Sequence, residues 1–168
     1  GVQRHGFLPL KEISSEYFVK QPDSGDRVQI RDVLREGQEI VVQVVKDPIG
    51  SKGARLTTQI SIPSCYMELL PQFKVSGVSS RIEEEAERQR LKALVSGQGP
   101  SASQSAGQGT SQNGHVSPGY IVRTNAEGQP AEALAEDIAY LGRVWALIEQ
   151  NVRATTVGGC VYEDLSLP

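Results

Sequence analysis

The fold of this chain is decided by residues 34–62, LREGQEIVVQVVKDPIGSKGARLTTQISI. Apolar and polar side chains alternate along residues 55–62, and this period of two predicts a strand with one buried and one wet face. Residues 40–45 form a nearly continuous β-branched run, typical of a strand covered on most of both sides. Asp47-Pro48 and Gly50 supply turn chemistry between the two. Because an isolated hairpin is marginal in water, we expect both strands to belong to a larger sheet or a small barrel.

Composition sets bounds on what this sequence can be. The 168 residues are 38% hydrophobic, which suits one ordinary domain or, as we prefer, two small ones. The net charge of -3 gives no global basic field, so any contact with RNA needs a local patch. Cys65 and Cys160 make neither a disulfide framework nor a zinc site; we interpret both as inert thiols, with a bridge as the alternative. Since no apolar stretch approaches the roughly 18 residues of a membrane span and no signal peptide opens the chain, we expect no membrane span and a cytoplasmic location.

The rest of the chain predicts a second, mixed domain that begins after Ile62. Residues 81–97 are helical in propensity, with Ser80 and Glu83 at capping-box spacing. Residues 97–118 consist mostly of Ser, Gly, Gln and Asn, a composition that cannot bury enough apolar surface to order itself, so we expect a flexible insertion. Residues 119–124 read as a short buried strand. Apolar side chains then recur at helical spacing over residues 130–152, which predicts the longest helix of the chain.

Nothing in the sequence indicates catalysis. Walker, nucleophile-elbow and HExxH patterns are absent, and most carboxylates fall on helix faces where solvation explains them. Lys52, on the turn beside the polar face of the second strand, is a candidate contact to a nucleic-acid backbone, with Phe7 as its stacking aromatic. The alternative is a routine turn lysine and a core phenylalanine. Arg123 and Thr124, at one strand end, could hold a phosphate; the alternative for the arginine is a structural salt bridge to the acidic helix.

These residues occur within longer blocks of sequence that resemble a known protein family. The chain contains GFLPLKEISSEYF, VLREGQEIVVQVVKDPIGSKGARLTTQISIPSCYMELLP, GVSSRIEEEAERQRLK, GYIVRTNAEG and EALAEDIAYLGRVWALIE in this order. Together they resemble the bacterial ribonuclease E/G family over nearly the whole chain, and the VVQVVKDPIGSKGARLTT and RIEEEAER segments are nearer to its ribonuclease G branch.

The resemblance implies an α+β fold with two parts. Residues 1–62 would be an incomplete five-stranded OB-fold barrel of the ribosomal-protein-S-one type, which binds RNA. Residues 63–156 would be a small α/β sensor domain with two helices and the flexible 97–118 insertion, and residues 157–168 would start the link to a catalytic region. Phe7 and Lys52 match RNA-binding positions of the OB-fold, and Arg123 and Thr124 match the pair that grips the 5′-monophosphate of RNA.

The same resemblance implies a function. Members of the family are Mg²⁺-dependent endoribonucleases that cut single-stranded RNA in ribosomal RNA maturation and messenger decay, and they act as homo-oligomers. We expect this sequence to be a fragment of such an enzyme that binds single-stranded RNA with a 5′-monophosphate, carries no cofactor of its own and lacks the catalytic carboxylates, so whether it is itself an enzyme stays open. The alternative is a non-enzymatic, OB-like protein interaction module.

Overall fold

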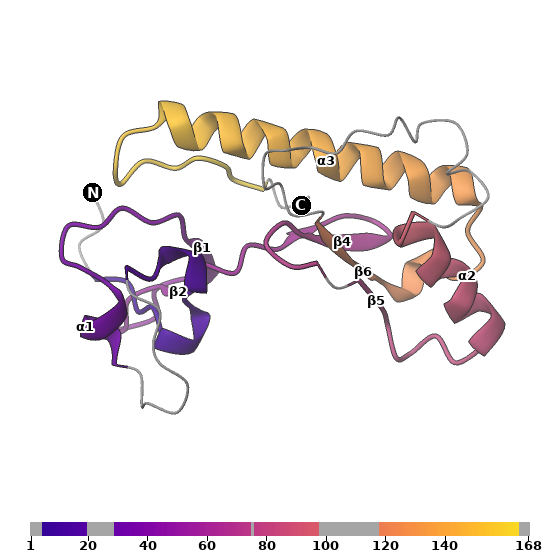
Figure 1. Cartoon of the computed structure of the whole chain (residues 1–168), viewed down its shortest axis with the longest axis horizontal. Helices are drawn as coiled ribbons and strands as arrows, with labels where there is room; N and C mark the ends of the chain where they lie inside the picture. The colour runs from indigo at the N-terminus through magenta and orange to yellow at the C-terminus, as the bar shows by residue number, and fades with distance from the viewer. Residues whose placement is uncertain (1–4, 20–28, 75, 98–117, 165–168) are drawn as a thin grey trace. The chain divides into compact units, whose positions relative to one another are not determined.

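A computed structural model describes residues 5–19, 29–74, 76–97 and 118–164. The chain is of the mixed α+β class, as predicted, and forms two compact units (Figure 1). One unit comprises Gly1–Ile60 with Asn151–Pro168, and the other comprises Ser61–Gln150. Among the described residues no barrel closes. Apart from its two end residues, the predicted insertion at 97–118 lies outside the described residues.

The first unit is built around the predicted hairpin. Strands β1 (Gln43–Lys46) and β2 (Arg55–Thr57) pair antiparallel, with Gln43 opposite Thr57 and an irregularity between Val44 and Lys46. Three short helical turns accompany them: η1 (Leu10–Glu12), η2 (Ser15–Tyr17) and α1 (Ile30–Val33). The hairpin is therefore confirmed, although the described residues of this unit contain a sheet of two strands only.

The strand predicted over residues 55–62 is wrong in its length. β2 ends at Thr57, and Ile62 begins a strand of the other sheet. The break occurs at the fully buried Thr58, whose backbone N–H and side-chain hydroxyl both donate to the Glu12 carbonyl, at 2.9 and 2.8 Å. Because these donors serve the η1 turn, the residue cannot continue the ladder with β1.

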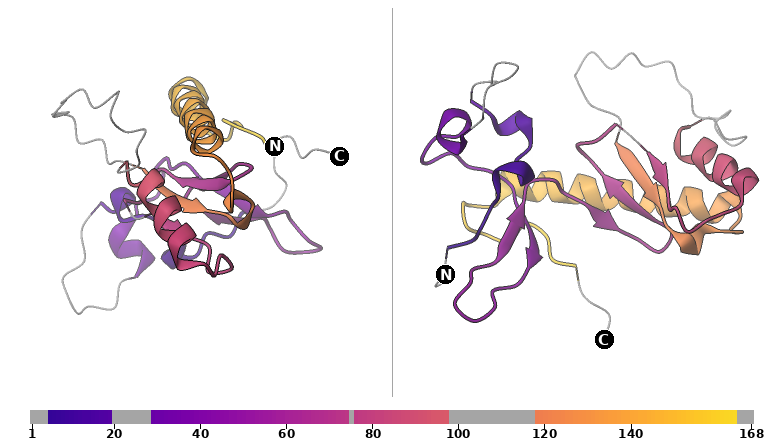
Figure 2. Two further views of the ribbon diagram at one scale, coloured as in Figure 1. Left: turned by 90° about the vertical axis from the view of Figure 1, so that its right-hand side faces the viewer. Right: turned by 90° about the horizontal axis from the view of Figure 1, so that it is seen from below.

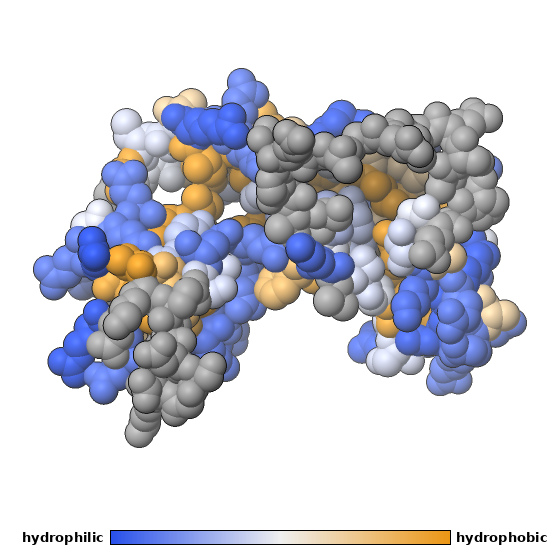
Figure 3. All heavy atoms as spheres, viewed as in Figure 1, coloured by the Kyte–Doolittle hydropathy of each residue, from blue (hydrophilic) through white to orange (hydrophobic). Residues whose placement is uncertain are grey.

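The expected burial of the first strand is also wrong. Val44 and Val45 are 54% and 52% exposed, and Ile49 in the following turn is exposed as well. Hydrophobic atoms accordingly reach the surface of the molecule (Figure 3). The β-branched run correctly predicted a strand, but strand propensity does not indicate how much of the strand its neighbours cover.

The second unit contains a four-stranded sheet in the order β3-β4-β6-β5. Its strands are β3 (Ile62–Pro63), β4 (Met67–Leu70), β5 (Gly77–Val78) and β6 (Gly119–Val122). The β3–β4 and β4–β6 pairs are antiparallel, whereas β5 and β6 are parallel. Helix α2 (Glu85–Val95) contacts β5 and β6, and α3 (Ala131–Ala154) runs alongside the sheet (Figures 1 and 2). The strand predicted at 119–124 is confirmed over Gly119–Val122.

The two longer helices differ in how well the sequence predicts them. The helix predicted at 130–152 is confirmed as α3, and its stripe is buried at Leu134, Leu141 and Ile148. The capping box is wrong, because α2 begins at Glu85 and its N-cap residue makes no side-chain cap bond. The segment that would form the box is held by Arg88, whose Nη1 donates to the carbonyls of Ser79 and Ile82 at 2.7 and 3.0 Å.

Two further expectations concern the membrane and the cysteines. In the described ranges, no helix combines the length and the apolar character needed to cross a bilayer. Cys65 and Cys160 are both exposed free thiols, so the bridge considered as an alternative is absent.

Candidate nucleic-acid interface

One edge of the four-stranded sheet gathers polar side chains from three strands. β5 and β6 are parallel with Val78 opposite Val122, and the Ser79 N–H donates to the Val122 carbonyl at 2.9 Å. The residues that follow both strands therefore emerge at the same edge. Arg81 follows β5 and Arg123 follows β6, and both are exposed. The short loop that enters the antiparallel β4, residues 64–66, lies at this edge too, since Met67 faces Val122.

Arg123 is anchored by the loop yet keeps donors to spare. Its backbone N–H donates to the Tyr66 carbonyl at 2.8 Å, and its Nη1 donates to the Ser64 carbonyl at 2.7 Å. A guanidinium has five N–H donors. Within the described ranges, Arg123 makes no ion pair, so the structural salt bridge to the acidic helix is not observed. The remaining N–H groups are available to an anionic ligand.

Thr124 directly follows and begins the short helical turn η4 (Thr124–Ala126). Its side chain is half-buried, and its hydroxyl has no hydrogen-bond partner among the residues that the structure describes. The backbone of η4 is closed by the Glu127 N–H, which donates to the Thr124 carbonyl at 3.1 Å. The sequence-predicted pair therefore lies at the end of β6 as an exposed guanidinium followed by a half-buried hydroxyl.

Sequence reasoning missed the residues that hold the loop. Asp137 of α3 accepts from the Ser64 hydroxyl at 2.5 Å and from the Tyr66 N–H at 3.1 Å, both through Oδ2. The helical pattern placed this carboxylate with the solvated ones, but the side chain is half-buried. The signal was available, because residue 137 is three positions after Leu134 and four before Leu141, both buried on the core face.

In the first unit, Phe7 lies beside β2. Its N–H donates to the Ala54 carbonyl at 2.8 Å and its carbonyl accepts from the Leu56 N–H at 2.9 Å, so Phe7 faces Arg55 in a parallel bridge. Gly53 allows the close approach, since a Cβ there would lie 1.8 Å from the His5 carbonyl oxygen. Phe7 is 62% exposed, which excludes the interpretation as a core side chain.

Lys52 lies in the exposed turn between β1 and β2, where it pairs with Ile49. The polar side chains of β2, by contrast, already contact Glu12 of η1. Arg55 lies 3.8 Å from the Glu12 carboxylate, and the Thr57 hydroxyl donates to the same carboxylate at 3.0 Å. The expected wet face of this strand is thus covered by η1, which leaves Phe7 and Lys52 as its exposed candidates.

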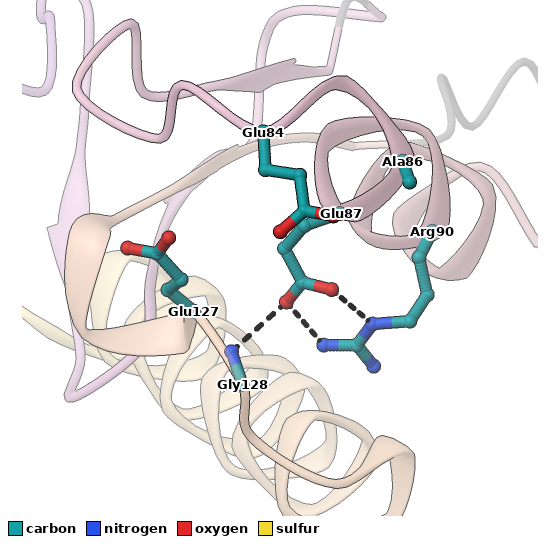
Figure 4. A pocket seen from close by; sticks show the side chains of 6 residues that line it. All are labelled: Glu84, Ala86, Glu87, Arg90, Glu127 and Gly128. Carbon is teal, nitrogen blue, oxygen red and sulfur yellow. Dashed lines mark hydrogen bonds and ion pairs between the residues drawn. The ribbon is translucent and has the colours of Figure 1, made fainter.

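A hollow of about 330 Å³ lies between the start of α2 and the residues that follow η4 (Figure 4). Its one cation, Arg90, uses Nε and Nη2 for a bidentate contact to Glu87, with both bonds at 2.6 Å, and Nη2 also donates to the Gln129 carbonyl. The Gly128 N–H donates to the same carboxylate at 2.9 Å. The hydrogen bonds from Arg90, with a smaller effect from Gly128, lower the pKa of Glu87 from 4.5 to about 2. This cluster joins α2 to the loop, and because the Glu87 carboxylate neutralises Arg90, it is a poor site for a phosphate.

Among the residues that the structure describes, no group of three or more His, Cys, Asp or Glu side chains is arranged to hold a metal ion. No role of Mg²⁺ is therefore assigned to these residues.

The sequence pattern that defines the Ribonuclease E/G family matches residues 61–168. The chain belongs to this family. Ribonuclease G of Salmonella typhimurium (strain SL1344) is 39% identical over 170 residues, which cover 99% of this chain and 32% of that protein. Ribonuclease G of Escherichia coli (strain K12) is 38% identical with the same coverage. Ribonuclease E of Escherichia coli (strain K12) is 40% identical over 165 residues, covering 98% of this chain and 14% of that protein. This member of the Ribonuclease E/G family thus spans about a third of the length of the ribonuclease G relatives.

Proposed function

We propose that this chain is the segment of a ribonuclease E/G-type endoribonuclease that binds single-stranded RNA and senses its 5′-monophosphate. Residues 1–62 would act as a partial OB-fold that contacts the RNA strand, and residues 63–156 as the sensor of its 5′ end. Residues 157–168 would begin the link to a catalytic region. The parent enzyme would be cytoplasmic, homo-oligomeric and Mg²⁺-dependent, and would act in ribosomal RNA maturation and messenger decay.

The observation that carries this proposal is that the Arg123 side chain is exposed and has no acidic partner among the described residues. Its guanidinium is oriented by the Ser64 carbonyl at 2.7 Å. Arginine binds phosphate oxygens through parallel N–H donors, and the adjacent Thr124 hydroxyl supplies a further donor. A terminal monophosphate has more free oxygens and more charge than a phosphodiester, so a fork with a neighbouring hydroxyl suits an RNA end.

The exposed Arg81 at the same sheet edge adds positive charge without consuming any of these donors. It lies on the turn that follows β5, where its own N–H donates to the Ser79 hydroxyl at 3.3 Å. Two guanidinium groups on one edge attract an anionic end more strongly than one does, and this long-range part of the attraction falls with salt.

The first unit supplies groups that suit the body of the strand. Exposed aromatic rings stack on bases of any sequence, and lysines on mobile turns neutralise phosphodiesters. Phe7 and Lys52 are exposed in this manner, and Phe7 faces a residue only three positions beyond Lys52. Three residues span at most about 10 Å, so one short stretch of RNA could contact both.

The test measures binding of one A/U-rich RNA that carries either a 5′-monophosphate or a 5′-hydroxyl. Fluorescence anisotropy with the chain is expected to show tighter binding of the monophosphate form. Arg123→Ala should weaken that binding by about 10- to 100-fold, the effect of losing a hydrogen bond to a charged group, and should weaken binding of the hydroxyl form only by the small amount that losing one positive charge causes.

The matched control is Arg143→Ala, which removes an exposed arginine from α3 of the same unit. It lowers net charge by the same amount, so it should shift both affinities equally and preserve their ratio. Equal affinity of the unaltered chain for the two RNAs would refute sensing.

A second candidate function is supported by the apolar surface of the first unit. Val44, Val45 and Ile49 are all more than half exposed, which suits burial against another protein chain. Binding of this kind is insensitive to salt, whereas RNA binding through phosphates weakens steeply as salt rises. Titration against RNA at two salt concentrations therefore separates the two functions.

A further inference from the structure

We infer that Asp137 is a positioning residue for the 5′-phosphate site, acting through the 64–66 loop on Arg123. This inference rests on the proposed function. Asp137 lies on α3, whereas the loop belongs to the β3–β4 hairpin and Arg123 follows β6. The three are joined by hydrogen bonds: the guanidinium of Arg123 donates to the loop, and the loop donates to the carboxylate of Asp137.

The first link fixes the loop to the helix. Oδ2 of Asp137 lies 2.5 Å from the Ser64 hydroxyl and 3.1 Å from the Tyr66 N–H, so one carboxylate oxygen holds both ends of the loop. Within the hairpin itself, the Ser64 N–H donates to the Met67 carbonyl at 2.8 Å, and the Ser64 hydroxyl lies at 2.8 Å from the same carbonyl. Hydrogen bonds to a charged acceptor are stronger than neutral ones, so the helix contributes the stronger restraint.

The second link fixes the arginine to the loop. The Ser64 carbonyl accepts from Nη1 of Arg123 at 2.7 Å, and the Tyr66 carbonyl accepts from its backbone N–H at 2.8 Å. Asn125 reaches the third carbonyl of the loop, that of Cys65, at 3.4 Å. The orientation of the Ser64 peptide thus decides where the free N–H groups of Arg123 point.

The placement of Asp137 argues against a purely structural role. Its position is flanked on the core face of α3 by Leu134 and Leu141, which are 2% and 0% exposed. A carboxylate is costly to bury, and the described residues give it no cationic partner. An apolar residue here would suit the core, so the carboxylate is explained by what it holds.

A purely electrostatic effect of Asp137 and a positioning role predict opposite changes in phosphate affinity when the residue is removed. A negative charge near an anionic ligand repels it, so removing Asp137 would tighten phosphate binding if charge alone mattered. A positioning role predicts the opposite, because the loop and the guanidinium lose their fixed orientation.

The experiment measures the ratio of dissociation constants for 5′-hydroxyl and 5′-monophosphate RNA, using the full 168-residue chain. Asp137→Ala is expected to lower this ratio about tenfold, whereas the conservative Asp137→Asn, which keeps an acceptor oxygen, should retain most of it. Glu136→Ala, which removes the exposed neighbouring carboxylate, is the matched control and should leave the ratio unchanged. In an Arg123→Ala background, Asp137→Ala should have no further effect on the ratio, since it acts through the arginine.

Each other outcome decides against the inference. An unchanged or increased ratio in folded Asp137→Ala overturns the positioning role while leaving 5′ sensing intact. Absence of discrimination in the unaltered chain overturns the proposed function, and this inference with it. If circular dichroism shows that Asp137→Ala does not fold, Ser64→Ala carries the test. It removes the hydroxyl that reaches the carboxylate and the contacts of that hydroxyl with the Met67 backbone, but it keeps the bond from the residue 64 N–H to the Met67 carbonyl.

Discussion

Acidification should remove the stabilising contribution of the Glu87–Arg90 pair, and Glu87→Gln tests this. The carboxylate receives two bonds of 2.6 Å from Arg90 and one of 2.9 Å from the Gly128 N–H. The mutation removes the charge but keeps an oxygen for Gly128. We expect it to destabilise the second unit at pH 7 and to have little effect at low pH.

The magnitude follows from the pKa of Glu87, which these bonds lower from 4.5 to about 2. One pKa unit corresponds to 1.36 kcal/mol, so the full difference would be about 3 kcal/mol. The Arg90 side chain is 37% exposed, and the two residues are neighbours on one helix, so solvent screens the pair. We therefore expect a loss of about 1 to 2 kcal/mol at pH 7.

The direction of the pH dependence is fixed by the sign of the change. Because the pKa is lowered in the folded state, the contribution is complete above the unfolded value of 4.5. As the pH falls from about 5 toward 2, the unfolded chain binds a proton that the folded chain does not, and the contribution disappears. At pH 3 the difference between wild type and variant should be less than half its value at pH 7.

Urea unfolding at pH 7 and pH 3 measures both differences. Trp145 is the single tryptophan of the chain and lies in α3, so its fluorescence reports on this unit. Glu83→Gln, at an exposed glutamate just before the same helix, is the matched control and should be nearly neutral. A difference between wild type and Glu87→Gln that is equal at both pH values would refute the reasoning.

Three further predictions concern RNA binding and the core. Phe7→Ala should weaken binding of single-stranded RNA by about 1 to 3 kcal/mol, equally for both 5′ ends, because a stacking ring does not read the terminus; the same anisotropy titration measures this. Lys52→Gln should reduce the slope of log affinity against log salt by about 1, measured by repeating the titration from low to high salt. Leu141→Ala, at a side chain that is 0% exposed, should cost about 2 to 5 kcal/mol in urea unfolding, whereas Leu147→Ala, at a side chain that is 48% exposed, should cost less than about 0.5 kcal/mol.

The sequence predicted elements whose signal is local. α3 was predicted from the recurrence of apolar residues over many turns, and the β1–β2 hairpin from its turn chemistry. It could not predict where β2 ends, because Thr58 is withdrawn from the ladder by Glu12, a residue 46 positions away in the chain. The Ser80–Glu83 capping box failed for a similar reason, since Arg88 holds the preceding turn in another conformation.

Of the residues in the candidate site, the sequence predicted the neighbouring Arg123 and Thr124 but not the residues that hold the loop. Arg123 and Thr124 stand together at a strand end, and adjacency in sequence is enough to notice them. Asp137 and Ser64 lie 73 positions apart and meet only after the sheet and α3 pack. Polarity alone placed Asp137 in solvent, and only its spacing from Leu134 and Leu141 indicates the core face.

The direction of β6 has a practical consequence. The strand begins at Gly119 and ends at Val122, so Arg123 is attached to one end and the chain from residue 97 to 118 joins the other. Four strand residues separate these ends by about 13 Å. A peptide tag or a fluorescent reporter spliced in before Pro118 would therefore be connected to the strand at the end opposite Arg123.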